Sequence, residues 1–325
     1  MVSIRDVASK SGFGVGTVSR ALNGSGYISE DTKNKIMEAA RELNYQPNEL
    51  AKNLYRNHSG FIGIVVPDIE HPFFASLLKC VEQELYLHGY KCMACDISGK
   101  ERRELEFIEM LQKKVMDGLI LCVDPLDEVK IDKLIKPMVC IERKWADRIP
   151  LIHSDHIRGG RIAADIFIKK GCKKVLQFVP ARVTKDPYIK RHVELQRILT
   201  ANHVEVLQAD LEPNQMGYGY DTGSVKSFES MIDEADGIFA SDVVAVGCLK
   251  RALEKGINVP DQLKIIGYDG MPLTRLVHPT ITAICQNIPG LAKAGVETII
   301  KMIHRESSII EDVTIDISLQ KGGTV

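Results

Sequence analysis

From Phe61 onward, short apolar runs alternate with amphipathic stretches along most of the chain. Runs such as "FIGIVVPD" and "GLILCV" are typical of buried strands, and the stretches between runs, such as 73–88 and 188–201, have helical periodicity. Repeated strand–helix–strand units require parallel sheets with helices on both faces. The 325 residues suit two such units in series, so we expect two doubly wound lobes with crossovers near 145–160 and 284–290.

The first 57 residues lack this pattern and indicate helices instead. Ser3 is placed to cap a helix that starts at Ile4, and a second short helix is expected after Gly14. A third follows Ser29, in a stretch whose apolar residues recur at helical spacing. The chain therefore begins with a small all-α unit.

The stretch "GFGVGTVSRALNG" raises two alternatives, a phosphate-binding loop and a helix-turn-helix. A phosphate loop needs a strand before it, and the preceding "SIRDVASKS" is helical in pattern. A helix-turn-helix needs a small residue at the helix contact, which Ala8 supplies, and a turn residue tolerant of positive φ, which Gly12 supplies. Residues 1–58 carry eight Lys and Arg against six Asp and Glu, so a three-helix protein-interaction module stays an alternative.

Further motifs together resemble one family. The stretches "TVSRALNG" and "NELAKNL" are similar to the DNA-binding domain and hinge of the lactose/galactose-repressor family of bacterial transcription regulators. The resemblance continues in the same order through "IGIVVPDIEHPFFASLL", "SDHIRGGRIAADIFIKKG" and "PTITAICQN". It implies an all-α helix-turn-helix DNA-binding domain plus a hinge helix, followed by an α/β two-lobed core like the periplasmic binding proteins, with doubly wound parallel sheets.

The resemblance also implies domain boundaries. Residues 1–46 would form the helix-turn-helix domain, 47–58 the hinge, and 59–325 the core for effector binding and dimerisation. Within the core, the N-lobe would comprise about 59–157 and 287–317, and the C-lobe about 158–286 and 318–325.

Family positions that read DNA map onto the first unit. The positions that contact bases in the family are Val15, Gly16 and Arg20 in this chain, and Arg5 lies where a side chain can approach the groove. The positions that contact phosphates in the family are Ser3, Thr17, Ser19, Asn23 and Ser29. Two departures matter: Gly14 replaces a usual capping serine, and Gly16 has no side chain to reach a base. We therefore expect Arg20 to read guanine and Val15 to contact a thymine methyl, with a plain groove-wall contact as the alternative for Val15.

In the core, polar residues at strand ends predict an effector site between the lobes. Strand ends and family positions together give Asp68, His71, Phe73, Phe74, Arg143, Arg191, Tyr220, Asp242, Asp269 and Gln286. Carboxylates and arginines suit a polyhydroxylated ligand, because each binds two hydroxyls. The structural alternatives are a turn cap for Asp269, lobe core for Phe74 and a salt bridge for Arg191.

Other functional classes have weaker support. Cys92 and Cys95 form a CxxC, but residues three apart on a strand face opposite sides, which disfavours a metal or a disulfide. The cluster "HSDH" at 153–156 is an alternative metal site, although we expect no metal and no cofactor. No GxSxG, HExxH or complete Walker sequence indicates an enzyme. A sugar-binding receptor would need export, and the N-terminus lacks an apolar leader, so we expect a cytoplasmic protein with no membrane partner.

These observations together predict a DNA-binding transcriptional regulator, more specifically a repressor of a carbohydrate-utilisation operon. It would bind a palindromic double-stranded operator as a homodimer and respond to a small sugar-like effector in the cleft. A tetramer, and an effector that acts as co-repressor instead of inducer, are open alternatives.

The hinge yields a first prediction. In the family, paired hinge leucines wedge into the minor groove and kink the duplex, and Leu54 matches that position while the small Ala51 lets two hinges approach. Leu54→Ala should weaken operator binding sharply and leave effector affinity intact, as measured by DNA titration and calorimetry. Equal loss of both affinities would instead indicate that Leu54 packs under the core.

Overall fold

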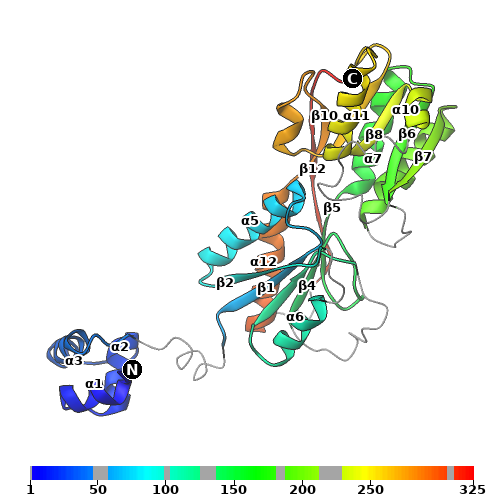
Figure 1. Cartoon of the computed structure of the whole chain (residues 1–325). Coiled ribbons are helices and arrows are strands. Elements are labelled where there is room, and N and C mark those ends of the chain that lie inside the picture. Colours follow the sequence, from blue (N-terminus) through cyan, green and yellow to red (C-terminus); the bar gives the residue numbers. More distant parts are fainter. Residues whose placement is uncertain are drawn as a thin grey trace. The chain divides into compact units, whose positions relative to one another are not determined.

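The computed structural model describes residues 2–46, 58–98, 103–124, 137–180, 187–211, 229–305 and 311–325. The chain divides into two compact units, Met1–Ser59 and Gly60–Val325, each described here by itself (Figure 1). Residues 47–57, which include the hinge residues Ala51 and Leu54, lie outside the described residues, as does Tyr220.

Within residues 2–46 of the first unit the structure has three helices, as the sequence predicts: α1 (Ile4–Ser11), α2 (Val15–Asn23) and α3 (Glu30–Glu42). Gly12 ends α1 in the left-handed conformation at φ 74°, which glycine adopts without steric cost. The helices close around a core of buried aliphatic side chains: Val7, Ala8, Val18, Ala21, Ile36, Ala39 and Ala40. This core fixes α2 against α1, and therefore also fixes which face of α2 is exposed.

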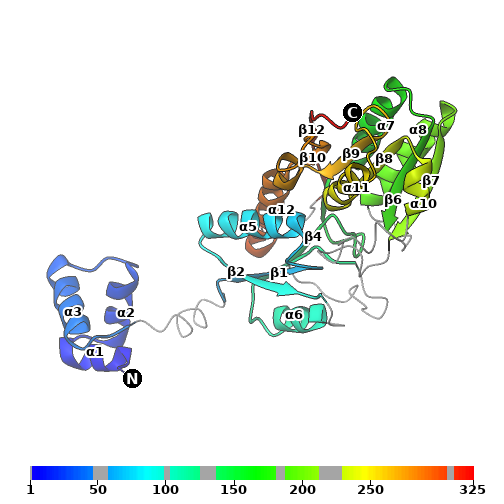
Figure 2. The ribbon, with the colours of Figure 1, turned by 45° about the horizontal axis from the view of Figure 1, so that its top comes forward.

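The first lobe is built on a parallel sheet of strand order β11-β5-β4-β3-β1-β2. Its strands are β1 (Phe61–Val66), β2 (Lys91–Asp96), β3 (Gly118–Leu121), β4 (Met138–Ile141), β5 (Leu151–Ser154) and β11 (Val313–Ile315). Figure 2 shows α5 (Pro72–Leu87) and α12 (Ile288–His304) on one face of this sheet and α6 (Arg103–Gln112) on the other. Helices on both faces explain why β1, β3 and β4 are almost continuously apolar.

The second lobe repeats this design, with strand order β12-β10-β9-β8-β6-β7 and one antiparallel pair, β10 with β12. Its strands are β6 (Lys174–Pro180), β7 (Glu205–Leu211), β8 (Gly237–Ser241), β9 (Lys264–Asp269), β10 (Thr282–Gln286) and β12 (Ile317–Gln320). Its helices are α7 (His156–Lys169), α8 (Lys190–Ala201), α10 (Glu229–Glu234) and α11 (Asp242–Glu254), with short 3-10 turns at η2 (Pro187–Ile189) and η4 (Pro272–Arg275). The predicted fold class is confirmed.

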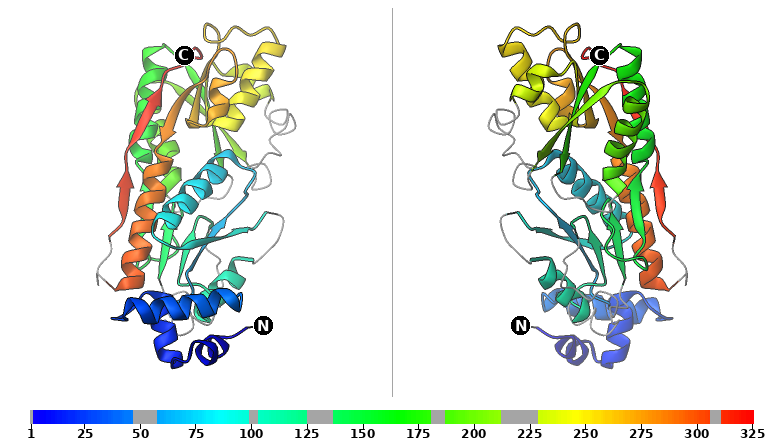
Figure 3. Two further views of the ribbon diagram at one scale, coloured as in Figure 1. Left: turned by 90° about the vertical axis from the view of Figure 1, so that its left-hand side faces the viewer. Right: turned by 90° about the vertical axis from the view of Figure 1, so that its right-hand side faces the viewer.

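The chain passes between the lobes three times (Figure 3). It leaves β5 for α7 at Asp155 and returns from β10 to α12 at Asn287, so both predicted crossovers are confirmed. A third crossing runs from β11 to β12 through Asp316, next to the lobe boundary expected at about 317/318. The crossings are joined to each other: the Asp155 N–H donates to the Ile315 carbonyl at 2.9 Å, and Arg158 pairs with Asp316 at 3.0 Å.

Two glycines of α7 lie in close contacts: Gly160 faces α8, and Gly159 faces strand β9. A Cβ atom added to Gly160 would collide with the backbone carbonyl of Arg191, and one added to Gly159 would meet the ring of Tyr268. Neither neighbour is the free end of a flexible side chain, so the contact tolerates only hydrogen atoms at these positions. The pair "GG" in "HIRGGR" is thus a packing requirement that also sets where α8 begins.

Gly160→Ala should lower the free energy of unfolding by about 1–3 kcal/mol, because overpacking against a backbone carbonyl outweighs the better helix propensity of alanine. Denaturant unfolding followed by circular dichroism measures the change. Arg161→Ala, one position along, is the control: its side chain is 57% exposed and loses one ion pair with Glu194, so its effect should stay under about 1 kcal/mol. Equal stability of the two variants would contradict the close-contact explanation.

Candidate functional site

The exposed face of α2 carries the residues predicted to read DNA. Val15 is 42% exposed, an unusual position for a large apolar side chain, and Arg20 is also exposed with its Nε 3.3 Å from the Gly16 carbonyl. Gly14 caps α2 without any side-chain hydrogen bond, as its lack of a side chain predicts. Val15 and Gly16 are thus exposed at the start of α2 and Arg20 is exposed further along the same helix, which is compatible with reading a major groove.

The residues predicted to contact phosphates lie around this helix, and several have local roles as well. Ser3 Oγ and N–H both donate to Asp6, at 2.8 and 2.7 Å, and Ser29 Oγ accepts the Thr32 N–H at the start of α3. Asn23 donates to Ser19 at 3.3 Å. Arg5 is exposed on α1, and Thr17 is half-buried in α2. Their contacts with DNA stay predictions.

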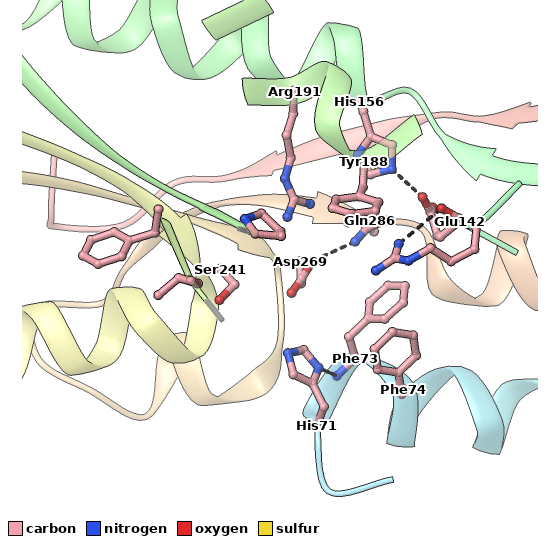
Figure 4. A pocket seen from close by; sticks show the side chains of 14 residues that line it. His71, Phe73, Phe74, Glu142, His156, Tyr188, Arg191, Ser241, Asp269 and Gln286 are labelled. Atoms are coloured by element: carbon pink, nitrogen blue, oxygen red, sulfur yellow. Dashed lines mark hydrogen bonds and ion pairs between the residues drawn. The ribbon is translucent and has the colours of Figure 1, made fainter. Parts of the chain in front are cut away.

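A pocket lies at the carboxyl ends of the strands of the second unit, with walls from both lobes (Figure 4). Its empty space, which includes open solvent at the pocket mouth, is about 650 Å³. Seven of the predicted residues line it: His71, Phe73, Phe74, Arg143, Arg191, Asp269 and Gln286. Strand ends from two sheets converge there because parallel strands end at the same edge of a sheet.

The start of α5 supplies one wall of the pocket. His71 caps this helix, and its Nδ1 accepts the Phe73 N–H at 3.3 Å. Burial lowers the pKa of His71, although Asp269 and Asp68 oppose the shift, so the ring is neutral at pH 7 and carries its hydrogen on Nε2. The rings of Phe73 and Phe74 meet edge to face at 5.2 Å, beside His71. This wall offers a flat apolar surface with one hydrogen-bond donor at its edge.

Arg143 extends across a ring from the other lobe. Its guanidinium lies 3.8 Å from the ring centroid of Tyr188, and its Nε is 3.0 Å from Asp124 Oδ1. The side chain is only about 10% exposed, so the ring and the carboxylate hold the guanidinium in one place. Because Tyr188 belongs to the second lobe, this contact also joins the two lobes at the pocket.

Asp269 provides the acceptor on the opposite side. It follows a buried strand in an unusual backbone conformation, φ 115°, and accepts the Gln286 Nε2–H at 2.7 Å. Gln286 in turn accepts Ser154 Oγ–H at 2.6 Å. Burial raises the pKa of Asp269, while the charge of the nearby Arg191 guanidinium opposes this. Such strain at a non-glycine residue is typical of binding sites.

Two of the predicted residues, Asp68 and Asp242, are not among the residues that line this pocket. Asp68 closes the turn after β1, where its Oδ1 accepts the Glu70 N–H at 2.8 Å. Asp242 is 1% exposed, and its Oδ2 accepts the Met271 N–H at 2.5 Å. Burial, and then the charge of Asp269, raise the pKa of Asp242 well above its ordinary value. Both carboxylates thus bond backbone N–H groups instead of facing a ligand.

The structure adds residues that the sequence analysis did not select as site residues. Glu142, His156, Tyr188 and Ser241 contribute polar groups, and Phe178, Pro180 and Leu211 contribute apolar wall. Four of the seven end or directly follow a strand, so the rule used for Asp269 would have found them: Glu142, Pro180, Leu211 and Ser241. Tyr188 has no such signal, because it lies in a 3-10 turn.

The alternative metal site at 153–156 is not supported. Asp155 caps α7, accepting the Arg158 N–H at 3.0 Å, while His153 Nε2 lies 3.3 Å from Thr314 Oγ1. His156 instead bonds Glu142 and Tyr268. Among the described residues, no group of three His, Cys, Asp or Glu side chains is arranged to hold a metal ion. Cys92 and Cys95 are both free thiols on β2.

Comparison with known proteins agrees with this architecture. Residues 3–48 match the family model "Bacterial regulatory proteins, lacI family". Residues 59–182 match "Periplasmic binding proteins and sugar binding domain of LacI family", and residues 164–325 match a periplasmic binding protein-like domain. None of the helices in the described part of the chain has the length and apolarity needed to cross a membrane.

Three similar proteins cover most or all of the chain. A ribose operon repressor of Halalkalibacterium halodurans is 34% identical, over 94% of this chain and 92% of the relative. A sucrose operon repressor of Streptococcus mutans is 30% identical over the full length of both. A periplasmic binding protein/LacI transcriptional regulator from Alkaliphilus metalliredigens, complexed with D-xylulofuranose, is 27% identical, with a TM-score of 0.72 over 82% of this chain and 99% of the other. The chain therefore belongs to the lacI family of bacterial regulatory proteins.

Proposed function

We propose that this protein is a sugar-responsive transcriptional repressor that controls a carbohydrate-utilisation operon. The observation that carries the proposal is the presence, in one chain, of an exposed helix-turn-helix reading face and an interlobe pocket with aromatic walls. Relatives named ribose and sucrose operon repressors support it. We place the protein in the cytoplasm, where its operator is, and assign it no catalytic activity.

The pocket's chemistry suits a neutral polyol of pentose or hexose size. Phe73 and Phe74 offer apolar faces to the C–H side of a sugar ring. Arg143 and Arg191 offer donors to hydroxyl oxygens, and Asp269 offers an acceptor to hydroxyl hydrogens. The similar protein complexed with D-xylulofuranose supports a pentose-sized ligand, so D-ribose is the first candidate.

We propose that the protein binds a palindromic operator as a homodimer, although a tetramer would present the same pair of helix-turn-helix domains. In this proposal residues 1–46 read DNA, 47–58 form the hinge with Ala51 and Leu54 at the minor groove, and 59–325 bind the effector and the second copy. Large apolar side chains exposed on the core support assembly: Tyr86 and Leu87, each 76% exposed, and Leu276, 84% exposed. An effector shifts such a dimer only by its difference in affinity between the two lobe arrangements.

The test combines ligand binding with operator binding in the full-length protein. D-Ribose and a panel of sugars are screened by thermal shift, since a ligand at about 100 times its Kd adds about 2.7 kcal/mol. Operator duplexes are selected from a random library, and the hit sugar is then added to the selected complex. A hit sugar that changes operator affinity supports the proposal. Chemical turnover of the sugar, or absence of sequence-selective duplex binding, would contradict it.

Two reciprocal variants sharpen this test. Arg20→Ala should weaken selected-duplex binding by about 1–3 kcal/mol, the value of a guanine contact, and leave the sugar-induced thermal shift unchanged. Phe74→Ala should reduce the thermal shift and leave duplex binding in the absence of sugar unchanged, because its ring lies at the pocket wall. If either variant lost both activities while remaining folded, the separation of reading head and effector site would be wrong.

A further inference from the structure

Glu142 lines the pocket, but its carboxylate is occupied by protein groups. It is 3% exposed and follows β4 in the left-handed conformation, at φ 63°. Its Oε1 accepts the Ser154 N–H at 2.8 Å, and its Oε2 lies 2.5 Å from His156 Nε2. Burial would raise the pKa of Glu142, but the bonds from His156 and Ser154 outweigh it and hold the pKa below its ordinary value. The carboxylate is therefore ionised and accepts on both oxygens.

This arrangement determines the proton positions on His156. An ionised carboxylate only accepts hydrogen bonds, so His156 Nε2 must carry a hydrogen. His156 is 2% exposed, and burial lowers its pKa against the attraction of Glu142, so the ring is neutral and Nδ1 is an acceptor. The group 2.8 Å from Nδ1 is the hydroxyl of Tyr268, which must then donate. The hydrogen bonds are therefore donated in one direction: Tyr268 donates to His156, and His156 donates to Glu142.

The ring of Tyr268 lies under the Arg191 guanidinium. The Arg191 guanidinium lies 4.1 Å from the Tyr268 ring centroid, and its Nε donates to His192 Nε2 at 3.2 Å. Tyr268 itself is fully buried, with the Phe239 ring edge to face at 5.9 Å. Tyr268 is thus held by His156 beneath Arg191, and Figure 4 shows the Arg191 guanidinium directed toward Asp269 and the pocket.

We propose that Glu142 and His156 are positioning residues that hold Tyr268, and through it Arg191, in the orientation that grips the effector. Glu142 is then not a ligand to the effector, although it lies at the pocket wall. His156, at the start of α7 in the second lobe, bonds Glu142 in the first lobe. The orientation of Arg191 therefore depends on how the two lobes are placed relative to each other. This inference rests on the proposed effector site.

The first test needs no ligand. Nitrogen-15 NMR of histidine-labelled full-length protein at pH 7.5, with His156 assigned through His156→Asn, should show His156 as the Nε2–H tautomer. In Glu142→Gln the amide has one acceptor oxygen for two donors, Ser154 N–H and His156 Nε2–H, so the His156 tautomer should change. Glu109→Gln, the same change on the exposed face of α6, should leave it unaltered. The proposal is overturned if His156 is the Nδ1–H tautomer in the unmodified protein, or if its tautomer is the same in Glu142→Gln as in the unmodified protein.

The second test is a double-mutant cycle in which calorimetry measures the affinity of each variant for D-ribose. Glu142→Gln and Tyr268→Phe should each weaken binding about tenfold, and the double variant no more than either alone, because both interrupt the same connection. Losses that multiply to about a hundredfold would show that Glu142 contacts the sugar directly, which overturns the proposal. Thermal unfolding of each variant confirms folding. If the unmodified protein does not bind ribose, ribose fails as the effector, and the NMR result alone decides the positioning role.

Discussion

The position of the pocket depends on one constraint, that strands of a parallel sheet all end at the same edge. Two sheets with this property face each other in the second unit, and each contributes side chains at the ends of its strands. The apolar strands themselves supply the buried cores that hold these ends in place. Binding chemistry is thus confined to the first residues beyond the strands, while the strands provide stability.

The polar residues between the lobes form two connected sets that begin at one residue. Ser154, the last residue of β5, gives its N–H to Glu142 and its hydroxyl to Gln286. The first bond leads through His156 and Tyr268 toward Arg191, and the second leads to Asp269. Ser154 is fully buried at the first interlobe crossing, so the residues of this crossing and the pocket residues share hydrogen bonds. Effector contacts and lobe geometry are therefore parts of one network.

Much of this could be predicted from the sequence, because the strong signals are local. Alternating apolar runs predict the sheets, and polar residues after strands predict His71, Arg143 and Asp269 at one site. The sequence does not decide between two local roles for a carboxylate at the end of a strand. Asp68 and Asp242 satisfy backbone N–H groups, and no sequence pattern distinguishes such a turn from a ligand contact. Long-range partners such as Tyr188 under Arg143 also have no local signal, since only packing brings them together.

The three crossings have a mechanical consequence. Asp155, Asn287 and Asp316 connect the lobes, and the bonds of Asp155 with Ile315 and of Arg158 with Asp316 tie the first crossing to the third. A single tether would allow one lobe to swivel and twist freely on the other. Three tethers, two of them bound to each other, restrict such swivelling and twisting. A ligand that favours one arrangement of the lobes would therefore act on few relative motions instead of many.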